Sequence, residues 1–254
     1  MKGTDKIEII PIRIKEDIVS GQNISDMIVK SISQVNESLK NNDVLVVTHK
    51  IISKAEDRLV SLAEIDPSSK AKRIAKSQSK DPRLVELIMS EALELVRIHD
   101  GVIIAETKHG FVCANAGIDI SNVDRDGNKV ALLPRDSDCS ASKIRKDIWN
   151  KEKKDVAVVI SDTFGRPFRE GQINVAIGVS GLNPIKSYVG KRDMYGKPLR
   201  VTEIAIADEI ASAAELVMKK SARIPVVILR GLRYSSRQTN ISTLIRPKES
   251  DFFR

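Results

Sequence analysis

The chain has 254 residues, a formal net charge of +8 and few aromatic residues, which make up 4% of the sequence. This length accommodates a sizeable core without disulfide staples. The two cysteines, Cys113 and Cys139, show neither a disulfide pattern nor metal-ligand spacing, which is typical of a reduced, cytoplasmic protein. The charge favours anionic partners, but the scarcity of stacking aromatics argues against nucleic acid, and no apolar run reaches the roughly 18 residues of a membrane span.

Strands and helices are predicted in mixed order along the chain. Alternating or uninterrupted apolar runs predict strands at 7–14, 44–47, 102–106, 156–160, 175–179 and 224–229. Apolar residues at helical spacing, preceded by capping residues such as Ser25, Asp66 and Asp81, predict helices at 26–39, 67–78, 82–97, 140–149 and 202–218. The segment 185–200 is predicted to be a loop.

This order does not alternate strictly between strand and helix, as a doubly wound parallel sheet would require. No G-x-G-x-x-G fingerprint and no P-loop is present. The sequence therefore predicts an α+β fold with mixed sheets and packed helices, not a Rossmann or P-loop fold. From Tyr234 onward the chain is polar and basic without a clear period, so a surface tail is expected over 234–254.

The stretch Ser161–Gly171, SDTFGRPFREG, follows the buried strand at 156–160 and is expected to be its exit loop. Asp162 beside the Thr163 hydroxyl suits a hard cation such as Mg²⁺ or Mn²⁺, which prefers oxygen ligands. Arg166 and Arg169 suit phosphate or carboxylate, because a guanidinium presents a planar fork of donors. The alternative is an ordinary strand exit with solvated charges.

A second loop of similar character, HGFVCANAGIDISN, runs over 109–122. Its Asp119 could share a cation with Asp162, since Mg²⁺ is commonly held by single carboxylates together with water and substrate phosphates. Asp119 could equally be a turn residue or a cap for Ser121. His109 is either structural or a base, and His49, at the end of the strand 44–47, is ambiguous.

Two further charged residues each allow a functional and a structural interpretation. Lys54 follows the strand 44–47 closely and could be a point charge for phosphate, or it could be a solvated lysine. Asp208 lies between apolar residues of the predicted helix 202–218 and could face inward, although a charge on the exposed helix face is the simpler reading.

Four segments together resemble the coenzyme F420-0:L-glutamate ligase (CofE) family, and they occur in that family's order. They are VVTHKIISKAE, HGFVCANAGIDISNV, SDTFGRPFREGQINVAIGVSG and ADEI, which begin at Val46, His109, Ser161 and Ala207. The resemblance covers most of 7–233, the expected catalytic unit of two intertwined lobes, and does not extend over the tail. It implies the two-lobed fold of that family and an intertwined homodimer.

The resemblance also implies a GTP-dependent ligase that joins L-glutamate to the deazaflavin phospholactate F420-0 and then adds γ-linked glutamates. It implies a need for Mg²⁺ or Mn²⁺, with K⁺ helping. By position, the metal ligands are expected to be Asp119, Asp162 and Thr163. By position, the GTP contacts are expected to be Lys15, Glu16, Asp17, Ile18, His49, Lys54 and Asn122. The sequence departs from the family over Lys219–Arg223, where archaeal relatives can carry a glutamate for a second metal.

The expected mechanism follows from the chemistry of amide formation. Because a carboxylate is a poor electrophile, the γ-phosphoryl group of GTP would first pass to it and give an acyl phosphate, which the glutamate amine then attacks. Arg166 and Arg169 are the candidates for holding substrate carboxylates, and His109 is the candidate base. A related ligase acting on another acid acceptor, and a basic nucleic-acid-binding protein, are the alternatives.

Overall fold

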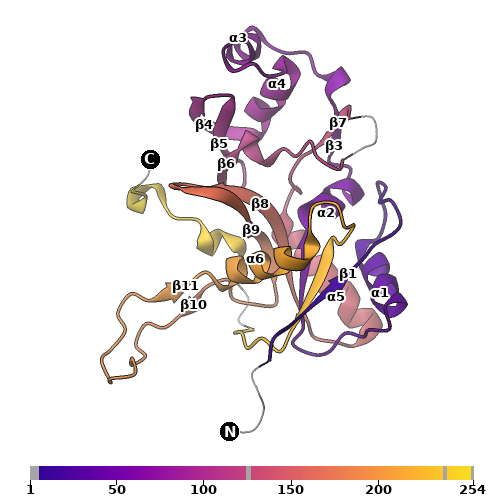
Figure 1. Ribbon diagram of the computed structural model, residues 1–254, viewed down its shortest axis with the longest axis vertical. Helices are drawn as coiled ribbons and strands as arrows, with labels where there is room; N and C mark the ends of the chain where they lie inside the picture. The colour runs from indigo at the N-terminus through magenta and orange to yellow at the C-terminus, as the bar shows by residue number, and fades with distance from the viewer. Residues whose placement is uncertain (1–5, 124–126, 237–238, 253–254) are drawn as a thin grey trace.

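The largest element of the fold is a five-stranded sheet with the order β1-β12-β2-β8-β9 (Figure 1). The structure is a computed structural model and describes residues 6–123, 127–236 and 239–252. The strands are β1 (Glu8–Ile12), β2 (Val44–Thr48), β8 (Ala157–Arg166), β9 (Arg169–Ser180) and β12 (Val226–Arg230). β2 and β8 run parallel, and the other neighbouring pairs are antiparallel. Pro11 lies in β1, an edge strand, where a residue without an N–H is tolerated.

Both faces of this sheet are covered, which explains why its strands read as uninterrupted apolar runs. Leu45 and Val158 face one core, which also contains side chains of α1 (Ile24–Gln34) and α5 (Ser137–Glu152). Their neighbours Val46 and Val159 face the other core, under α6 (Ile206–Met218). Successive side chains of a strand point to opposite faces, so each central strand contributes to both cores.

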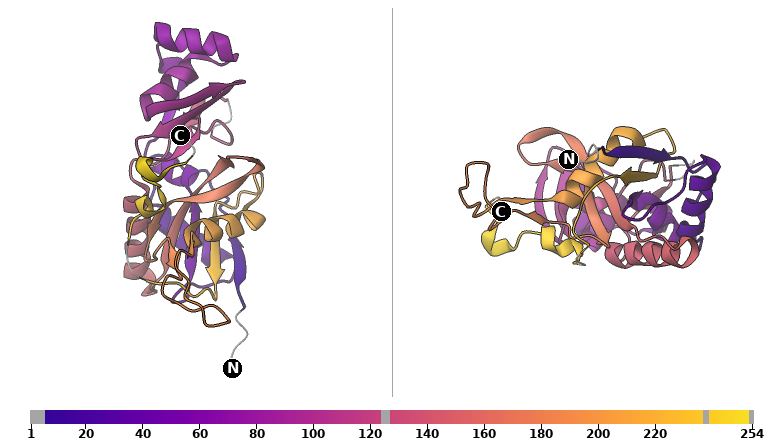
Figure 2. Two further views of the ribbon diagram at one scale, coloured as in Figure 1. Left: turned by 90° about the vertical axis from the view of Figure 1, so that its left-hand side faces the viewer. Right: turned by 90° about the horizontal axis from the view of Figure 1, so that it is seen from below.

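A second group of elements stacks above one end of the sheet (Figure 2). Its helices are α3 (Ser69–Gln78) and α4 (Pro82–Glu91). Its strands form a three-stranded sheet, β4 (Ala92–His99), β5 (Val102–Thr107) and β6 (Val112–Ala114), and a two-stranded one, β3 (Leu59–Ser61) and β7 (Lys129–Ala131). Apart from β6, these elements share a third apolar core. The predicted α+β class with mixed sheets is thereby confirmed, and the sheet order is not that of a Rossmann fold.

The remaining elements are short. They are α2 (His49–Ala55), β10 (Lys186–Ser187), β11 (Glu203–Ile204) and the 3₁₀ turns Leu62–Glu64, Asn115–Gly117, Ile241–Leu244 and Lys248–Ser250. β10 and β11 pair at the base of a ribbon that projects from the body, as Figures 1 and 2 show. In the described part of the chain, no helix has the length and apolar composition needed to cross a membrane.

The C-terminal segment, predicted to be a surface tail, is anchored to the body through a few of its residues. Ile241 is buried against the core under α6, and its backbone N–H donates to Asp138 of α5 at 3.0 Å. Further along, the Lys248 ammonium lies 2.9 Å from Glu106 of β5 and 3.1 Å from Glu94 of β4. The described part of this segment therefore connects the large sheet to the second group of elements.

The predicted helix 82–97 is wrong in its second half. α4 begins at Pro82 with Asp81 as its cap, as predicted, but it ends at Glu91, and the chain continues as β4. Ala92 and Leu95, predicted to belong to a helical stripe, instead pair with β5 and pack against the same core as α4. Strand pairing outweighs the weak local helical preference of this β-branched stretch.

The stretch Ser161–Gly171 is also not a loop. β8 continues to Arg166 and turns back into β9 at Arg169, so most of the stretch is a β-hairpin, with Asp162 opposite Val175 and Thr163 opposite Asn174. The polar residues interrupt the apolar run but not the hydrogen-bonded ladder.

Helix starts and ends also shifted from their predicted positions. α1 is capped by Asn23 rather than Ser25 and ends at Gln34, before Asn36, which adopts a positive φ of 56°. α3 is capped by Ser68, α5 begins earlier with Asp136 as its cap, and α6 begins only at Ile206.

Candidate functional site

Two parallel strands end side by side at the candidate site. Thr48, the last residue of β2, pairs with Ser161 of β8. After these positions β2 turns into α2 at His49, while β8 presents Asp162 and Thr163. The carboxyl ends of parallel strands meet at one edge of a sheet, where ligands commonly bind. This register therefore brings His49 and Asp162 together from positions far apart in the sequence.

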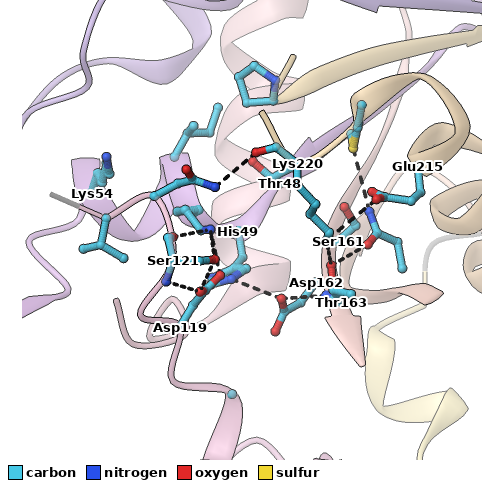
Figure 3. A pocket seen from close by; sticks show the side chains of 18 of the residues that line it. Thr48, His49, Lys54, Asp119, Ser121, Ser161, Asp162, Thr163, Glu215 and Lys220 are labelled. Carbon is cyan, nitrogen blue, oxygen red and sulfur yellow. Dashed lines mark hydrogen bonds and ion pairs between the residues drawn. The ribbon is translucent and has the colours of Figure 1, made fainter. Parts of the chain in front are cut away.

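A cavity of about 800 Å³ lies at this edge of the sheet (Figure 3). Its lining comes from the segment after β1, the first turns of α2, the Asp119 loop, the β8–β9 hairpin and the segment between α6 and β12. Side chains from the large sheet and from the Asp119 loop therefore line one space, which is large enough for a nucleotide-sized ligand.

His49 and Asp162 form a close pair inside the cavity. The Nε2 atom of His49 lies 3.2 Å from Oδ1 of Asp162, although it is buried without hydrogen-bond geometry to any partner. On its other side, Nδ1 lies 3.3 Å from the hydroxyl of Ser53. Oδ1 of Asp162 also accepts the backbone N–H of Thr163 at 2.6 Å. The carboxylate of Asp162 is thus held in place by its surroundings.

Asp119 is fixed by its backbone and by a lysine. Its N–H and C=O both pair with Ala131, and Oδ1 accepts the N–H and the hydroxyl of Ser121, each at 2.8 Å. Oδ2 lies 2.7 Å from the ammonium of Lys50, which also donates to the carbonyl of Ser121. Burial favours a raised pKa, but the hydrogen bond and charge of Lys50, together with Ser121, outweigh it, so the pKa of Asp119 is lowered.

Thr163 lies between an amide and a second lysine. Its hydroxyl donates to Oδ1 of Asn174 at 2.7 Å and accepts from the ammonium of Lys220 at 2.6 Å. Lys220 also lies 3.7 Å from Glu215. The backbone carbonyl of Lys220 accepts the side-chain N–H of Asn122 at 3.1 Å, which links this side of the cavity to the Asp119 loop.

The oxygen donors in the cavity are of the kind that Mg²⁺ or Mn²⁺ prefers. Asp119, Asp162 and Thr163 offer two carboxylates and a hydroxyl from two segments, the Asp119 loop and β8. Among the residues that the structure describes, no three His, Cys, Asp or Glu side chains gather closely enough to hold a metal ion by themselves. This donor set therefore fits an ion that keeps several ligands from water or from substrate phosphate, as Mg²⁺ usually does.

Basic residues line the same cavity. Lys54 belongs to α2, and Lys219, Lys220 and Arg223 belong to the segment before β12. Arg223 donates to the backbone carbonyl of Lys15 at 2.9 Å and lies 3.5 Å from Asp17. The cavity thus combines carboxylates with cations, which is the chemistry that a phosphate-bearing substrate and a divalent ion require together.

Most of the site residues predicted from the sequence meet at this cavity. Its lining includes Glu16, Asp17, Ile18, His49, Lys54, Asp119, Asn122, Asp162 and Thr163. Lys15 lies beside it through the contact of its carbonyl with Arg223. The shared cavity supports grouping these residues, whereas their individual roles stay predictions.

The three predicted catalytic residues do not line the cavity. His109 points its Nε2 toward the backbone carbonyls of Pro134 and Arg135, at 2.9 and 3.2 Å, which matches the structural alternative for this histidine. Arg166 donates to the carbonyls of Glu170 and Gly171 within its own hairpin, and Arg169 is exposed. Their catalytic roles stay predictions without support from this geometry.

Asp208, the aspartate of the helix 202–218, does face inward. Its Oδ1 accepts the backbone N–H of Ala176 at 2.9 Å, and burial raises its pKa. Asp208 therefore connects α6 to β9 and has a structural part, not a surface one.

Sequence reasoning missed Lys50 and Lys220. Lys50 was overlooked because α2 was not predicted, yet Lys50 and Lys54 are four residues apart and so share one helix face. Lys220 lies in an irregular segment without a periodic pattern; the resemblance pointed to the segment Lys219–Arg223, but no role was predicted for Lys220 itself.

Comparison with known proteins places the chain in one family. Residues 11–231 match the model of the family described as F420-0:Gamma-glutamyl ligase. The chain is 46% identical to the coenzyme F420:L-glutamate ligase of Methanothermobacter thermautotrophicus over 238 residues, which are 92% of this chain and 94% of that protein. It is 45% identical to the protein of the same name from Methanocaldococcus jannaschii over 217 residues, 85% of this chain and 86% of that protein.

A third relative extends the similarity to the whole chain. The coenzyme F420:L-glutamate ligase of Methanopyrus kandleri is 40% identical over 259 residues and is covered in full, as is this chain. The resemblance carried by the Asp119, Asp162 and His49 segments is thereby confirmed. The chain belongs to the F420-0:gamma-glutamyl ligase family.

Proposed function

We propose that this protein is a GTP-dependent ligase that joins L-glutamate to the carboxylate of coenzyme F420-0 and then adds further glutamate through γ-linkages. The names of its relatives support the reaction and the two organic substrates. The observation that carries the proposal is the cavity in which Asp119, Asp162 and Thr163 face Lys54 and Arg223. Acids and bases in one cavity suit a nucleotide polyphosphate with its divalent ion.

The reaction needs an activated carboxylate. The γ-phosphoryl group of GTP moves to a carboxylate oxygen of the acceptor, so the bond to the β-phosphate breaks, GDP leaves and an acyl phosphate forms. The amine of glutamate then attacks the carbonyl carbon, and the bond to phosphate breaks as the amide forms. Inorganic phosphate and a proton leave. Positioning and charge stabilisation are the main contributions that a protein makes to such a transfer.

Asp119 and Asp162 are the residues proposed to hold Mg²⁺ or Mn²⁺, while Thr163, the third ligand expected from the resemblance, already contacts Lys220 and Asn174. When bound, the ion supplies charge neutralisation for the phosphates of GTP. His49, 3.2 Å from Asp162, would keep that carboxylate in one orientation. The GTP contacts are proposed for the segment Lys15–Ile18 and for His49, Lys54 and Asn122.

A homodimer is part of the proposal. The ribbon between β10 and β11 projects from the body (Figure 2), and Met194, Tyr195 and Val201 on it are more than 80% exposed, at 87%, 81% and 87%. Apolar side chains grouped on a projecting element favour a contact with a second copy. Light scattering coupled to size-exclusion chromatography would give the mass of the protein in solution, and a monomer at micromolar concentration would contradict this part.

The reaction itself is tested by incubating the protein with F420-0, L-glutamate, GTP and Mn²⁺, followed by mass spectrometry of the deazaflavin. We expect glutamate-sized mass increments together with equal amounts of GDP and phosphate. A parallel sample with ATP tests the nucleotide preference, and a panel of other carboxylic acids tests the acceptor. Product from another acid alone would redirect the proposal to a related ligase, and no product from any acid would overturn it.

A further inference from the structure

One cation is already built into the cavity at Thr163. The ammonium of Lys220 donates to the Thr163 hydroxyl at 2.6 Å and lies 3.7 Å from the carboxylate of Glu215. Figure 3 shows the Lys220 side chain reaching from the segment after α6 toward these two residues. Because the Thr163 hydroxyl also donates its hydrogen to Asn174, Lys220 uses an acceptor site that a metal ion at Thr163 would otherwise use.

The backbone of Lys220 is held from both sides of the cavity. Asn122, from the Asp119 loop, donates to its carbonyl at 3.1 Å. Arg223 anchors the end of the same segment by donating to the carbonyl of Lys15 at 2.9 Å. Lys219 and Arg223 adopt positive φ angles of 52° and 54°, which are unfavourable for residues with a side chain. Such backbone conformations persist only where the surroundings fix them, so the backbone of Lys220 is held at a place from which its ammonium reaches Thr163.

The two ends of the cavity differ in the cation that they hold. At the Asp119 end, the ammonium of Lys50 lies 2.7 Å from a carboxylate oxygen, so its partner there is an acid. At the Thr163 end, the partners are a neutral hydroxyl and Glu215, which is farther away. A divalent ion gains more from the carboxylates of Asp119 and Asp162 than from the hydroxyl, which the tethered ammonium already occupies.

We propose that Lys220 is a tethered cation that takes the place of a dissociable one at the Thr163 end of the cavity. In this proposal its ammonium offsets the charge of a phosphate group bound there, so that no K⁺ and no second divalent ion is needed at Thr163. Lys220 then acts as a positioning residue for the phosphate-bearing substrate, and the inference rests on the proposed GTP-dependent function.

The test is chemical rescue of Lys220→Ala. Turnover of GTP and glutamate is measured in a background of tetramethylammonium, which is too large for the site of an ammonium ion, and then with K⁺, NH₄⁺ or methylammonium added at tens of millimolar. We expect wild-type turnover to be insensitive to the added cation. The variant should lose about tenfold to a hundredfold, the loss typical of a hydrogen bond to a charged group, and should recover partly with the small cations. Lys72→Ala, a surface change on α3, is the matched control.

A second measurement does not depend on turnover. Small cations should raise the melting temperature of Lys220→Ala over the tetramethylammonium background, but not that of wild type, because only the variant has a vacant cation site. The proposal would be overturned if K⁺ raised the turnover and the melting temperature of both proteins equally. It would also be overturned if Lys220→Ala had wild-type turnover, or if no cation restored the turnover of the variant. If wild type forms no product at all, the proposed function fails, whereas the melting measurement still decides the role of Lys220.

Discussion

His49 and Asp162 come from the ends of two neighbouring parallel strands, and their side chains lie 3.2 Å apart inside the cavity. His49 is almost fully buried, and Ser53 contacts the opposite side of its ring. Asp162 is therefore a carboxylate with little freedom to move, at the point where the two strands diverge. A change at this position should affect chemistry much more than folding.

Asp162→Asn is expected to reduce GTP turnover by about a hundredfold or more, since the amide is a poor ligand for a hard divalent ion. The change keeps the size of the side chain, so circular dichroism and melting temperature should stay close to wild type. Asp100→Asn, an exposed change in the turn between β4 and β5, is the matched control. Near-normal turnover of the Asp162 variant at saturating Mn²⁺ would contradict the metal assignment.

The pair of Asp119 and Lys50 should be visible in the pH dependence of stability. The pKa of Asp119 is lowered in the folded protein. The folded state therefore binds fewer protons at this carboxyl, and the resulting stabilisation is complete above the ordinary pKa of about 4 and is lost as the pH falls through the folded-state pKa. In Lys50→Met this lowering is largely removed.

The free energy of unfolding of Lys50→Met should therefore approach that of wild type as the pH is lowered from neutral toward about 3. Urea titrations at several pH values, with Lys72→Met as the control for loss of a surface charge, would measure the difference. A difference between Lys50→Met and wild type that is constant across this range would show that Asp119 does not depend on Lys50.

The two cysteines should differ sharply in reactivity. Burial, together with the negative charge of Asp162, raises the pKa of Cys113 to about 12, whereas Cys139 is exposed. At pH 8 only about one Cys113 thiol in ten thousand would be ionised. Mass spectrometry after brief iodoacetamide treatment should find alkylation at Cys139 alone in the native protein and at both residues in urea. Rapid native alkylation of Cys113 would mean that the loop around it opens readily.

Gly178 should tolerate no side chain. A Cβ atom there would lie 2.5 Å from the backbone carbon of Ser137, at the start of α5, which has little room to shift. Gly178→Ala should lower the free energy of unfolding by about 2 kcal/mol or more. Gly165→Ala, in the same hairpin, meets no atom within 4 Å and should change it by less than about 0.5 kcal/mol. Equal effects in urea denaturation would contradict this account of the α5–β9 contact.

The sequence allowed the chemistry of the strand ends to be predicted better than the shape of the segments around them. Asp162 and Thr163 stood out because polar residues follow an uninterrupted apolar run, and this pattern survives whether the chain then forms a loop or a hairpin. The hairpin itself depends on pairing between β8 and β9, a contact between segments that local composition does not encode. For the same reason Arg166 and Arg169 were expected at the site, whereas the hairpin directs the Arg166 side chain to the backbone carbonyl of Glu170.

Helix-to-strand switches and charged residues in irregular segments were harder to predict. β4 follows α4 without a turn residue between them, and the apolar spacing of Ala92 and Leu95 fits a helical stripe as well as a paired strand. Lys220 reaches Thr163 only because the segment after α6 is held by Asn122 and Arg223. Such a contact depends on the assembled tertiary structure and leaves no local signature.

The division of the apolar core has a consequence for how the protein could lose activity. Asp162 belongs to a strand whose side chains enter the two cores of the large sheet, whereas Asp119 is hydrogen-bonded to Ala131, which lies next to the third core. Separate cores can open by local unfolding at different free energies. In native-state hydrogen exchange, the amides around Asp119 should then exchange through local unfolding that has a lower free energy than the unfolding that exposes the amides of β8. A thermally stressed enzyme would in that case be inactive while most of its backbone is still protected from exchange.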